Sequence, residues 1–346
     1  MCQYQAVEGN VSDWHLAHYT ALARGGAGLV IVEATAVSPE GRITPGCTGL
    51  WEDAHIEGMA RIAAAIRAAG AIPGIQIGHA GRKGSANLPW EGDDHISQDD
   101  PRGWQTIAPS AEAFGGALSK IPREMELSDI ARVQGDFAAA ARRAYAAGFE
   151  WIELHFAHGF LASSFGSSYS NHRSDGYGGD QAGRHRFMIE TLAAVREAWP
   201  ERLPLTARIG LMEFDGHDEG RWAETVDLVR QLKSGGLDLL SASMGFSAPV
   251  GQVPWGPGFL LSAAARIRRD AGIAVGSAWL LDAPNDAERA VSEDHIDIVM
   301  MARALLANPH YPYQLATALG VPDPAWILPA PYAHWLARYR AHGGGL

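Results

Sequence analysis

Residues 128–160, SDIARVQGDFAAAARRAYAAGFEWIELHFAHGF, decide the fold. Apolar side chains recur at helical spacing up to Ala147, so a helix is expected there, with Ser128 as its cap. Gly148 ends this helix, because glycine adopts the left-handed conformation of a helix stop without strain. The apolar run Trp151–His155 follows at once and predicts a buried parallel strand. The apolar face of the helix is expected to consist of Ile130, Val133, Phe137, Ala141 and Ala144.

The same succession, a helix ended by glycine and then a short β-branched run, recurs along the chain and predicts seven strands. They span Leu29–Glu33, Ile72–Ile77, Trp151–His155, Leu205–Ile209, Leu237–Ala242, Ile273–Ala278 and Ile296–Met301. Helices and strands that alternate with short connections form a parallel α/β sheet covered by helices. Seven repeats come close to the eight of a (β/α)₈ TIM barrel, which is the fold class we expect.

The first strand of such a barrel is missing from this pattern. The sequence after Met1 is polar, so the missing strand is expected before residue 1, with the start of the chain truncated or misassigned. Its absence would leave two neighbouring strands with unpaired edges. An open doubly wound sheet is the alternative, but no Gly-x-Gly-x-x-Gly follows an early strand. In a barrel the long insertions lie on the catalytic face, and these are Gly81–Leu127, Gly159–Arg186 and Met244–Leu261.

Composition narrows the class of protein. The chain has 346 residues, 47% of them hydrophobic and 19% charged, enough for one large domain over residues 1–346. A formal net charge of −11 argues against nucleic acid as a partner. Cys2 and Cys47 are the only cysteines, which excludes a disulfide scaffold and favours a reducing cytoplasm. The sequence has no membrane-length apolar run and no signal peptide, so no membrane association is expected.

Two histidines, His155 and His158, follow one strand at the end where a barrel exposes side chains to substrate. As hydrogen-bond donors to a carbonyl oxygen they would stabilise developing negative charge. Taken alone, a His-x-x-His motif is more often a pair of packing or loop histidines, and that alternative stays open. Together with His79 the pair could instead ligate a metal ion in a metal-dependent hydrolase, although no carboxylate stands at ligand spacing.

Other polar side chains close neighbouring strands. Gln76 can donate and accept at once, as the pyrimidine edge of a flavin requires, and Arg208 can place positive charge beside an anionic cofactor. A buried ion pair is the structural alternative for Arg208. The last strands end near Trp279 and Arg303, where barrels commonly bind phosphate, although Arg303 also opens a helix and could face solvent.

In this order the motifs resemble the Old Yellow Enzyme family of NADH:flavin oxidoreductases, in its xenobiotic-reductase and YqjM-like branch, over essentially the whole chain. They are Met1-Cys2-Gln3-Tyr4, Val32-Glu33-Ala34-Thr35, Gln76 with His79-Ala80-Gly81-Arg82-Lys83, His155 to Phe160, Ser170 to Gly179, Arg208, Arg303 and the ending Leu328 to Tyr339. The resemblance implies FMN as the cofactor and NADPH or NADH as the reductant. It also implies hydride transfer to the β-carbon of a small α,β-unsaturated carbonyl or nitro compound.

The resemblance assigns a role to each matching residue. Those that line the flavin ring are Cys2, Ala34, Gln76 and Arg208, and those around its phosphate end are Ser243, Trp279, Ala302 and Arg303. Those that contact substrate are Tyr4, Lys83, His155, His158, Phe160 and Trp335. Among these, His155 and His158 hold the carbonyl, and Cys2 tunes the flavin. The C-terminal segment, residues 322–346, would carry Trp335 to a neighbouring subunit of a homodimer or higher oligomer.

Two residues depart from the family pattern. Phe160 stands where most relatives have the tyrosine that protonates the α-carbon, and phenylalanine has no exchangeable proton. Water or Tyr4 could deliver the proton instead, so we expect slower alkene reduction with flavin reduction preserved. Ala302 replaces the glycine before the phosphate-binding arginine. A non-catalytic flavin-binding remnant is therefore a further alternative, whereas the iron–sulfur members of the family do not fit a chain without a cysteine cluster.

Overall fold

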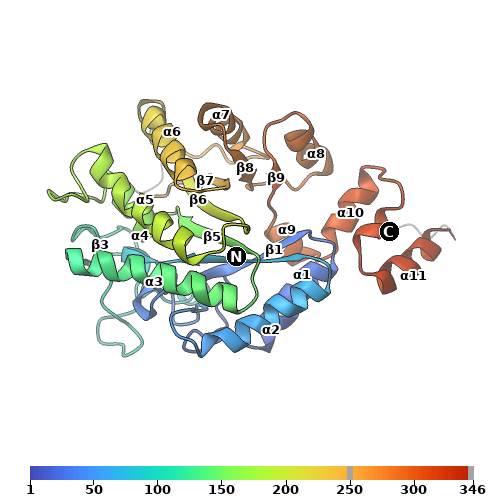
Figure 1. Cartoon of the computed structure of the whole chain (residues 1–346), viewed down its shortest axis with the longest axis horizontal. Coiled ribbons are helices and arrows are strands. Elements are labelled where there is room, and N and C mark those ends of the chain that lie inside the picture. The colour runs from blue at the N-terminus through green and yellow to red at the C-terminus, as the bar shows by residue number, and fades with distance from the viewer. Residues whose placement is uncertain (248–251, 342–346) are drawn as a thin grey trace.

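The computed structural model describes residues 1–247 and 252–341, which form one sheet of seven parallel strands wrapped by helices (Figure 1). The strands pair in chain order, β1-β2-β5-β6-β7-β8-β9, and every pairing is parallel. They are β1 (Leu29–Ala36), β2 (Ile72–Gly78), β5 (Trp151–Phe156), β6 (Leu205–Met212), β7 (Leu239–Met244), β8 (Ala274–Ser277) and β9 (Ile298–Val299). All seven expected strands are therefore present, in the order of a TIM barrel.

Helices alternate with these strands and cover the outside of the sheet. They are α1 (Asp13–Arg24), α2 (His55–Ala68), α3 (Leu127–Ala146), α4 (Leu161–Gly166), α5 (Gln181–Ala198), α6 (Asp218–Ser234), α7 (Leu261–Ala271), α8 (Pro284–Ser292), α9 (Arg303–Ala307), α10 (Tyr311–Ala318) and α11 (Ala330–Ala341). Short 3₁₀ turns lie at η1 (Pro39–Gly41), η2 (Gly81–Lys83), η3 (Pro89–Glu91) and η4 (Pro324–Ile327). Consecutive helices pack side by side, α1 with α2, α3 with α5 and α6 with α7.

The sheet is open between β9 and β1. In the part of the chain that the structure describes, β1 pairs in the sheet only with β2, and β9 only with β8. The carboxyl end of β1 is covered by a passing segment, in which the Leu50 N–H donates to Ala36 O at 2.9 Å. The gap falls where the sequence pattern lacks its first strand, so the sheet has the order of a barrel with one position open.

The long insertions follow strands, as expected. Residues 81–127 follow β2 and contain a two-stranded parallel ribbon of β3 (Ile107–Ala108) and β4 (Arg123–Glu124). Residues 159–186 follow β5 and contain α4. The insertion at 244–261 follows β7, and its residues 248–251 lie outside the described part of the chain. Insertions that follow parallel strands all lie at the carboxyl ends of those strands, which is the end of a barrel that carries its site.

Helix α3 confirms its expected apolar face but not its expected cap. The five residues of that face, Ile130, Val133, Phe137, Ala141 and Ala144, are at most 1% exposed. The helix begins at Leu127, so the prediction that Ser128 caps it is wrong. Glu126 is the cap, and it forms a capping box with Asp129, whose carboxylate accepts the Glu126 N–H at 2.9 Å. These two carboxylates satisfy N–H groups of the first turn, inside which Ser128 already lies.

Successive strand residues point to opposite faces of the sheet. The outward residues pack under the helices and form the core, as the 0% exposure of Ile75, Ile77, Leu154, Ala207 and Leu240 shows. The inward positions of the same strands carry polar side chains instead, among them Glu33, Gln76, Glu153, Arg208 and Ser243. The apolar core thus lies between sheet and helices, and the inner face of the sheet is polar.

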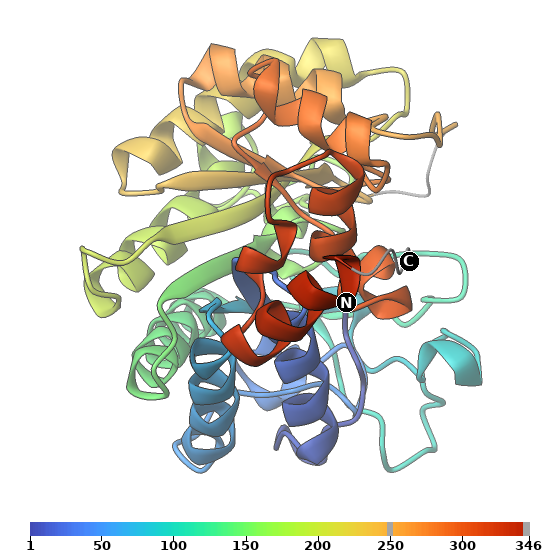
Figure 2. The same cartoon turned by 90° about the vertical axis from the view of Figure 1, so that its right-hand side faces the viewer.

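The C-terminal helices pack apart from this core. Figure 2 faces α10 and α11, which lie outside the helical layer. Around them is a second, small apolar cluster formed by Tyr313, Ala325, Leu328, Ile327, Ala333 and Leu336. Pro309, just before α10, abuts the end of α1, because a Cβ on Gly25 would overlap the Pro309 carbonyl. The contact between Gly25 and Pro309 therefore fixes the C-terminal helices to the start of the sheet.

Gly25→Ala should lower the free energy of unfolding by about 1–3 kcal/mol, the usual cost of an overpacked contact, because Pro309 must move away. Gly28→Ala is the matched control, since an added Cβ there meets no atom within 4 Å. The control should change the free energy by less than about 0.5 kcal/mol. Urea unfolding followed by circular dichroism measures both. Equal midpoints for the two variants would contradict the packing of Pro309 on Gly25.

Candidate active site

A row of polar side chains crosses the inner face of the sheet. The parallel register pairs Gln76 of β2 with Glu153 of β5, and His155 of β5 with Arg208 of β6. Gln76 Nε2 donates a hydrogen bond to Glu153 Oε1 at 2.6 Å. Because all four residues alternate with buried aliphatic ones, they face the inside together.

Glu153 and Arg208 are the charged centre of this row. Burial raises the pKa of the Glu153 carboxyl, and the charge of Arg208 and the Gln76 hydrogen bond act against that rise. Burial likewise lowers the pKa of the Arg208 guanidinium, and Glu153 opposes it. Each ion favours the charged form of the other. Sequence reasoning did not select Glu153, although a carboxylate inside an apolar strand was a usable signal.

The two histidines meet at the carboxyl end of β5. Their ring centroids are 4.8 Å apart and the rings are nearly perpendicular, at 84°. His158 has a φ of 65°, a left-handed conformation that residues with a Cβ adopt rarely and at a cost. The Phe160 ring centroid lies 4.9 Å from that of His155. The three aromatic rings therefore form one cluster at the carboxyl ends of the strands, which we call the mouth of the sheet.

Hydrogen bonding defines the tautomer of each imidazole. Ser243 Oγ accepts from Arg208 Nε at 3.2 Å and from Trp279 Nε1 at 3.3 Å, and it lies 2.7 Å from His158 Nε2. With both lone pairs of the hydroxyl engaged, its hydrogen points to His158 Nε2, which leaves the His158 proton on Nδ1. His155 Nδ1 accepts the Ala157 N–H at 3.4 Å, which leaves the His155 proton on Nε2.

Both imidazoles are neutral near pH 7. Burial lowers the pKa of His155 well below 6.5, and the charges of Arg208 and Lys83 lower it further. Burial also lowers the pKa of His158, helped by His155 and the same two cations. A lowered pKa keeps the neutral form as pH falls through 6.5. Each ring thus offers one N–H donor and no net charge.

The N-terminal residues lie against β1. Glu33 Oε2 accepts the Gln3 N–H at 2.8 Å and so anchors the segment that carries Cys2 and Tyr4. Burial raises the pKa of the Cys2 thiol, and the Glu33 charge adds to the rise. Burial raises the pKa of the Tyr4 phenol as well. Both groups are therefore protonated near neutral pH, and Cys2 is not a thiolate nucleophile. Glu33 is a second residue whose role sequence reasoning missed.

A small cavity at the ends of β1 and β2 touches the histidine cluster. Ala34, Gly78 and His79 line it together with His155 and Phe160. Ala34 is thereby placed beside the cluster, as its expected role requires. Together with the contacts above, the structure brings together eleven of the fourteen predicted site residues in two neighbouring groups. Beside β1 these are Cys2 and Tyr4, and at the mouth they are Ala34, Gln76, Lys83, His155, His158, Phe160, Arg208, Ser243 and Trp279.

Ala302, Arg303 and Trp335 lie away from both groups. Ala302 and Arg303 are exposed at the start of α9, and no hydrogen bond or ion pair of the Arg303 side chain occurs within residues 1–247 and 252–341. Trp335 is 69% exposed on α11. Ser243 and Trp279 are thus the only two of the expected phosphate-end residues that the described chain brings together. The roles assigned to Ala302, Arg303 and Trp335 stay predictions.

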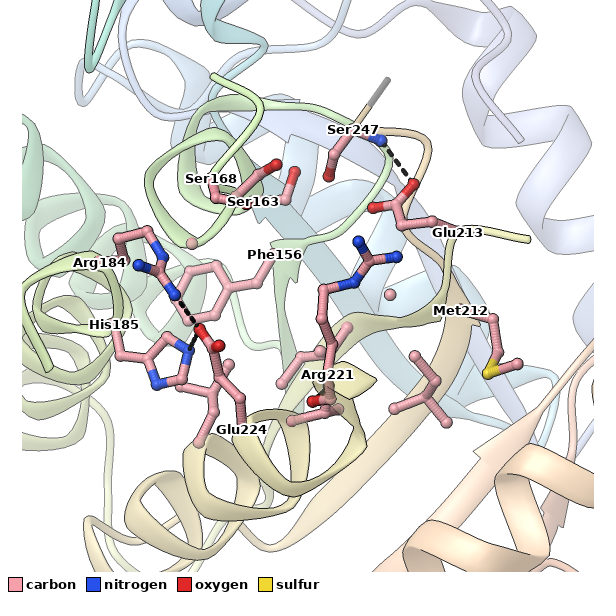
Figure 3. A pocket seen from close by; sticks show the side chains of 18 of the residues that line it. Phe156, Ser163, Ser168, Arg184, His185, Met212, Glu213, Arg221, Glu224 and Ser247 are labelled. Carbon is pink, nitrogen blue, oxygen red and sulfur yellow. Dashed lines mark hydrogen bonds and ion pairs between the residues drawn. The ribbon is translucent and has the colours of Figure 1, made fainter. Parts of the chain in front are cut away.

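A second pocket, with a volume of about 170 Å³, lies behind β6, between α5 and α6 (Figure 3). Its charged side chains are paired among themselves. Arg184 donates to Glu224 at 2.6 Å, and His185 Nε2 lies 3.3 Å from the same carboxylate. Glu213 accepts the Ser247 N–H at 3.0 Å. The pocket is separated from the polar row by the sheet itself, so the site we describe is the row at the mouth.

The fold and the polar row define an α/β protein with the strand order of a barrel and a polar candidate site at the carboxyl ends of its strands, where barrels carry their sites. A family model for the NADH:flavin oxidoreductase / NADH oxidase family matches residues 1–320. The NADPH dehydrogenase of Geobacillus thermodenitrificans is 39% identical over 324 residues, which cover 93% of this chain and 89% of that protein. The NADPH dehydrogenase of Bacillus subtilis is 36% identical over 328 residues, covering 94% and 90% respectively.

Solved structures agree with these relatives. Morphinone reductase in complex with tetrahydroNAD has a TM-score of 0.75 at 26% identity, with 93% of this chain and 85% of that chain covered. A 2-naphthoyl-CoA reductase has a TM-score of 0.80 at 27% identity, and the 93% of this chain that matches spans 49% of that longer chain. The chain belongs to the NADH:flavin oxidoreductase / NADH oxidase family, that is, the Old Yellow Enzyme family, and is an NAD(P)H-dependent flavin oxidoreductase.

Family membership implies FMN as the cofactor, and the polar row fits a flavin. Arg208 uses only Nε in a hydrogen bond to the described residues, so its terminal nitrogens are available. Glu153 Oε2 and Ser277 Oγ are buried without a hydrogen-bond partner there. Gln76 adds an amide that can donate and accept. A guanidinium and an amide with unused capacity suit the pyrimidine edge of an isoalloxazine.

The family assignment sets aside the metal-dependent hydrolase. The three histidines proposed as its ligands have other partners, since His79 Nδ1 accepts the Gly81 N–H at 3.0 Å and His158 meets Ser243. Over the described ranges, no group of three or more His, Cys, Asp or Glu side chains is arranged to hold a metal ion. In the same ranges no helix is both long and apolar enough to cross a membrane.

The tautomers and charges of the histidine pair can be measured directly. In ¹⁵N-correlation spectra of the purified protein, His155 should carry its proton on Nε2 and His158 on Nδ1 at pH 6, because both pKa values lie well below 6.5. His155→Asn and His158→Asn identify the two signals. Protonation of either ring with a midpoint near 6.5 would contradict the buried, neutral pair.

Proposed function

We propose that this flavin oxidoreductase is an ene-reductase, which reduces the activated C=C bond of small α,β-unsaturated carbonyl compounds and of nitro compounds as well. The observation that carries the proposal is the neutral pair His155 and His158, held beside Arg208 at the mouth of the sheet. Two structural relatives support the substrate class, since they are named as reductases of morphinone and of 2-naphthoyl-CoA, each a carbonyl compound.

The histidines act on the substrate carbonyl. When bound, reduced FMN supplies the hydride that adds to the β-carbon. As that carbon gains hydride, negative charge grows on the carbonyl oxygen, and His155 Nε2–H is the donor free to meet it. His158 adds its Nδ1–H. Neutral donors stabilise the growing charge without losing their protons to it, because the imidazole N–H is a very weak acid.

The polar row would hold the flavin ring. Gln76 and Arg208 are proposed to bind its pyrimidine edge, with Ala34 beside the ring. Cys2 would tune the flavin as a neutral thiol, and Tyr4 would contact substrate from the side of β1. The fixed charge of Arg208 favours the anionic, reduced state of a bound flavin. Ser243 and Trp279 are proposed toward the ribityl end, and Ala302 and Arg303 at the phosphate.

The reductant and the assembly state complete the proposal. NADPH is the proposed reductant, in line with the names of the bacterial relatives, and NADH is the alternative. A homodimer or higher oligomer would bring Trp335, which is 69% exposed, to a second copy of the site. Residues 342–346 of that C-terminal segment lie outside the described part of the chain. The unpaired Cys2 and Cys47 support a cytoplasmic location.

The decisive experiment separates the two half-reactions. The purified protein should bind FMN, lose its yellow colour anaerobically with NADPH or NADH, and regain it on addition of 2-cyclohexenone. His155→Ala should slow the return of colour about 10²–10³-fold, the usual loss for one oxyanion donor. His217→Asn, an exposed histidine away from the mouth, is the control and should match the parent.

Other outcomes assign the protein differently. A purified protein without flavin absorbance, in the presence of FMN, refutes the proposal. A protein that binds FMN but that neither nicotinamide reduces is the non-catalytic remnant, the alternative motivated by the missing first strand and by Phe160. If a nicotinamide reduces the bound flavin but no enone or nitro compound reoxidises it, the protein has the activity of its family. The proposed substrate class is then wrong.

A further inference from the structure

The proposed reaction leaves one proton unassigned. After hydride addition the α-carbon of the substrate needs a proton, and Phe160 cannot give one. His155 and His158 are neutral and therefore poor acids near pH 7. Burial raises the pKa of Tyr4 far above neutrality, so its phenol is a poor acid as well. Among the described residues, the Lys83 ammonium is a further proton-bearing group that contacts the cluster.

Lys83 is held against the cluster by several contacts. It ends the 3₁₀ turn η2, and its Nζ donates to the His158 carbonyl oxygen at 2.9 Å. The ammonium lies over two aromatic rings, 4.4 Å from the centroid of Phe114 and 5.3 Å from that of Phe160. Cation–π contacts on both sides fix its position over the ring that replaces the tyrosine.

Gly159 lies beside this lysine, where a Cβ would come within 2.4 Å of the Phe246 carbonyl oxygen. Its φ is +68°, and a Cβ there would come within 3.4 Å of Lys83 Cδ and 3.0 Å of Phe114 Cε2. The backbone at Gly159 therefore lies near both the lysine stem and the Phe114 ring. This leaves the ammonium next to Phe160, whose ring centroid is 4.9 Å from that of His155.

The electrostatic surroundings make this ammonium a usable acid. Burial and the charge of Arg82 lower the pKa of Lys83 to about 8, against the opposing charges of Asp93 and Glu213. The charged and titratable groups around Lys83 are Arg82, Asp93, Glu213, His155 and His158. An acid whose pKa lies near the working pH donates efficiently and is recharged readily from water.

We propose that Lys83 is the proton donor to the α-carbon, in place of the tyrosine that Phe160 replaces. This inference rests on the proposed ene-reductase activity and goes beyond a substrate-binding role. Hydride adds to the β-carbon, and the π-electron pair of the C=C bond moves toward the carbonyl oxygen held by His155. The enolate then takes a proton from Nζ: an N–H bond breaks and the α-C–H bond forms. The neutral amine regains its proton from water.

A pH dependence follows from this role. The donor is competent only when protonated, and a lowered pKa means that this form is lost as pH rises through about 8. Enone reduction by the reduced protein should therefore slow above that pH. Reoxidation by a quinone should not, because a quinone needs no proton on carbon.

The test uses stopped-flow reoxidation of the anaerobically reduced flavoprotein by 2-cyclohexenone and by a benzoquinone. Lys83→Met should slow the enone reaction about 100-fold, within the usual range for a general acid, and the quinone reaction less than about threefold. Lys83→Arg keeps the charge and the ring contacts but holds its protons too firmly to donate, so it should be as slow as Lys83→Met. Lys120→Met is the matched control, because Lys120 Nζ donates to Ser85 Oγ at 3.0 Å on the same insertion.

A second pair of variants tests for restoration. Phe160→Tyr should restore the enone reaction of Lys83→Met at least about tenfold and should speed the parent less, since one acid suffices. Three outcomes overturn the proposal: Lys83→Arg at the parental rate, equal slowing with both acceptors, or no fall above pH 8 in the parent. If the unsubstituted protein reacts with the quinone but not with the enone, the proposed ene-reductase function is wrong. The proposed role of Lys83, which rests on that function, is then wrong as well.

Discussion

The parallel register between β5 and β6 is the constraint on which the site depends. It pairs His155 with Arg208, so that the proposed hydrogen-bond donor to substrate and a fixed positive charge project from neighbouring strands to one side. A shift of either strand by one residue would turn its polar side chain into the helical layer and its aliphatic neighbours to the inner face. The outward residues prevent that shift, because Leu154 and Ala207 are fully buried under the helices. The apolar core thus fixes the chemistry on the opposite face.

Burial then gives each polar group its protonation state. The same desolvation keeps the imidazoles and the Cys2 thiol neutral and leaves Arg208 charged, with Glu153 beside it. Lys83 differs, since its ammonium rests on two aromatic rings and a carbonyl and its pKa is only moderately lowered. One physical cause, burial, therefore gives neutral imidazoles for the proposed carbonyl contact and a stronger acid, Lys83, for the proposed proton transfer.

The sequence predicts the strands and much of the site because both follow from local patterns. Apolar runs mark the seven strands of the main sheet, five of them after a glycine stop, and motif resemblance selects Gln76, His155 and Arg208. Contacts between distant segments were not predictable: Glu33 anchors Gln3 across the N-terminal segment, and the capping box at Glu126 replaces the serine expected there. The left-handed backbone at His158 also depends on its neighbours, since no residue pattern requires a histidine with positive φ.

The central claim is that a flavin binds over the polar row, and the affinity of the protein for FMN tests it most directly. Quenching of FMN fluorescence gives that affinity for the parent, for Arg208→Gln and for Arg221→Gln, an arginine paired with Asp215 at 2.6 Å outside the row. Arg208→Gln should bind FMN at least about tenfold more weakly, the loss expected for one charged hydrogen bond, and Arg221→Gln should bind as the parent does. Equal affinity in all three proteins would contradict a flavin site at Arg208.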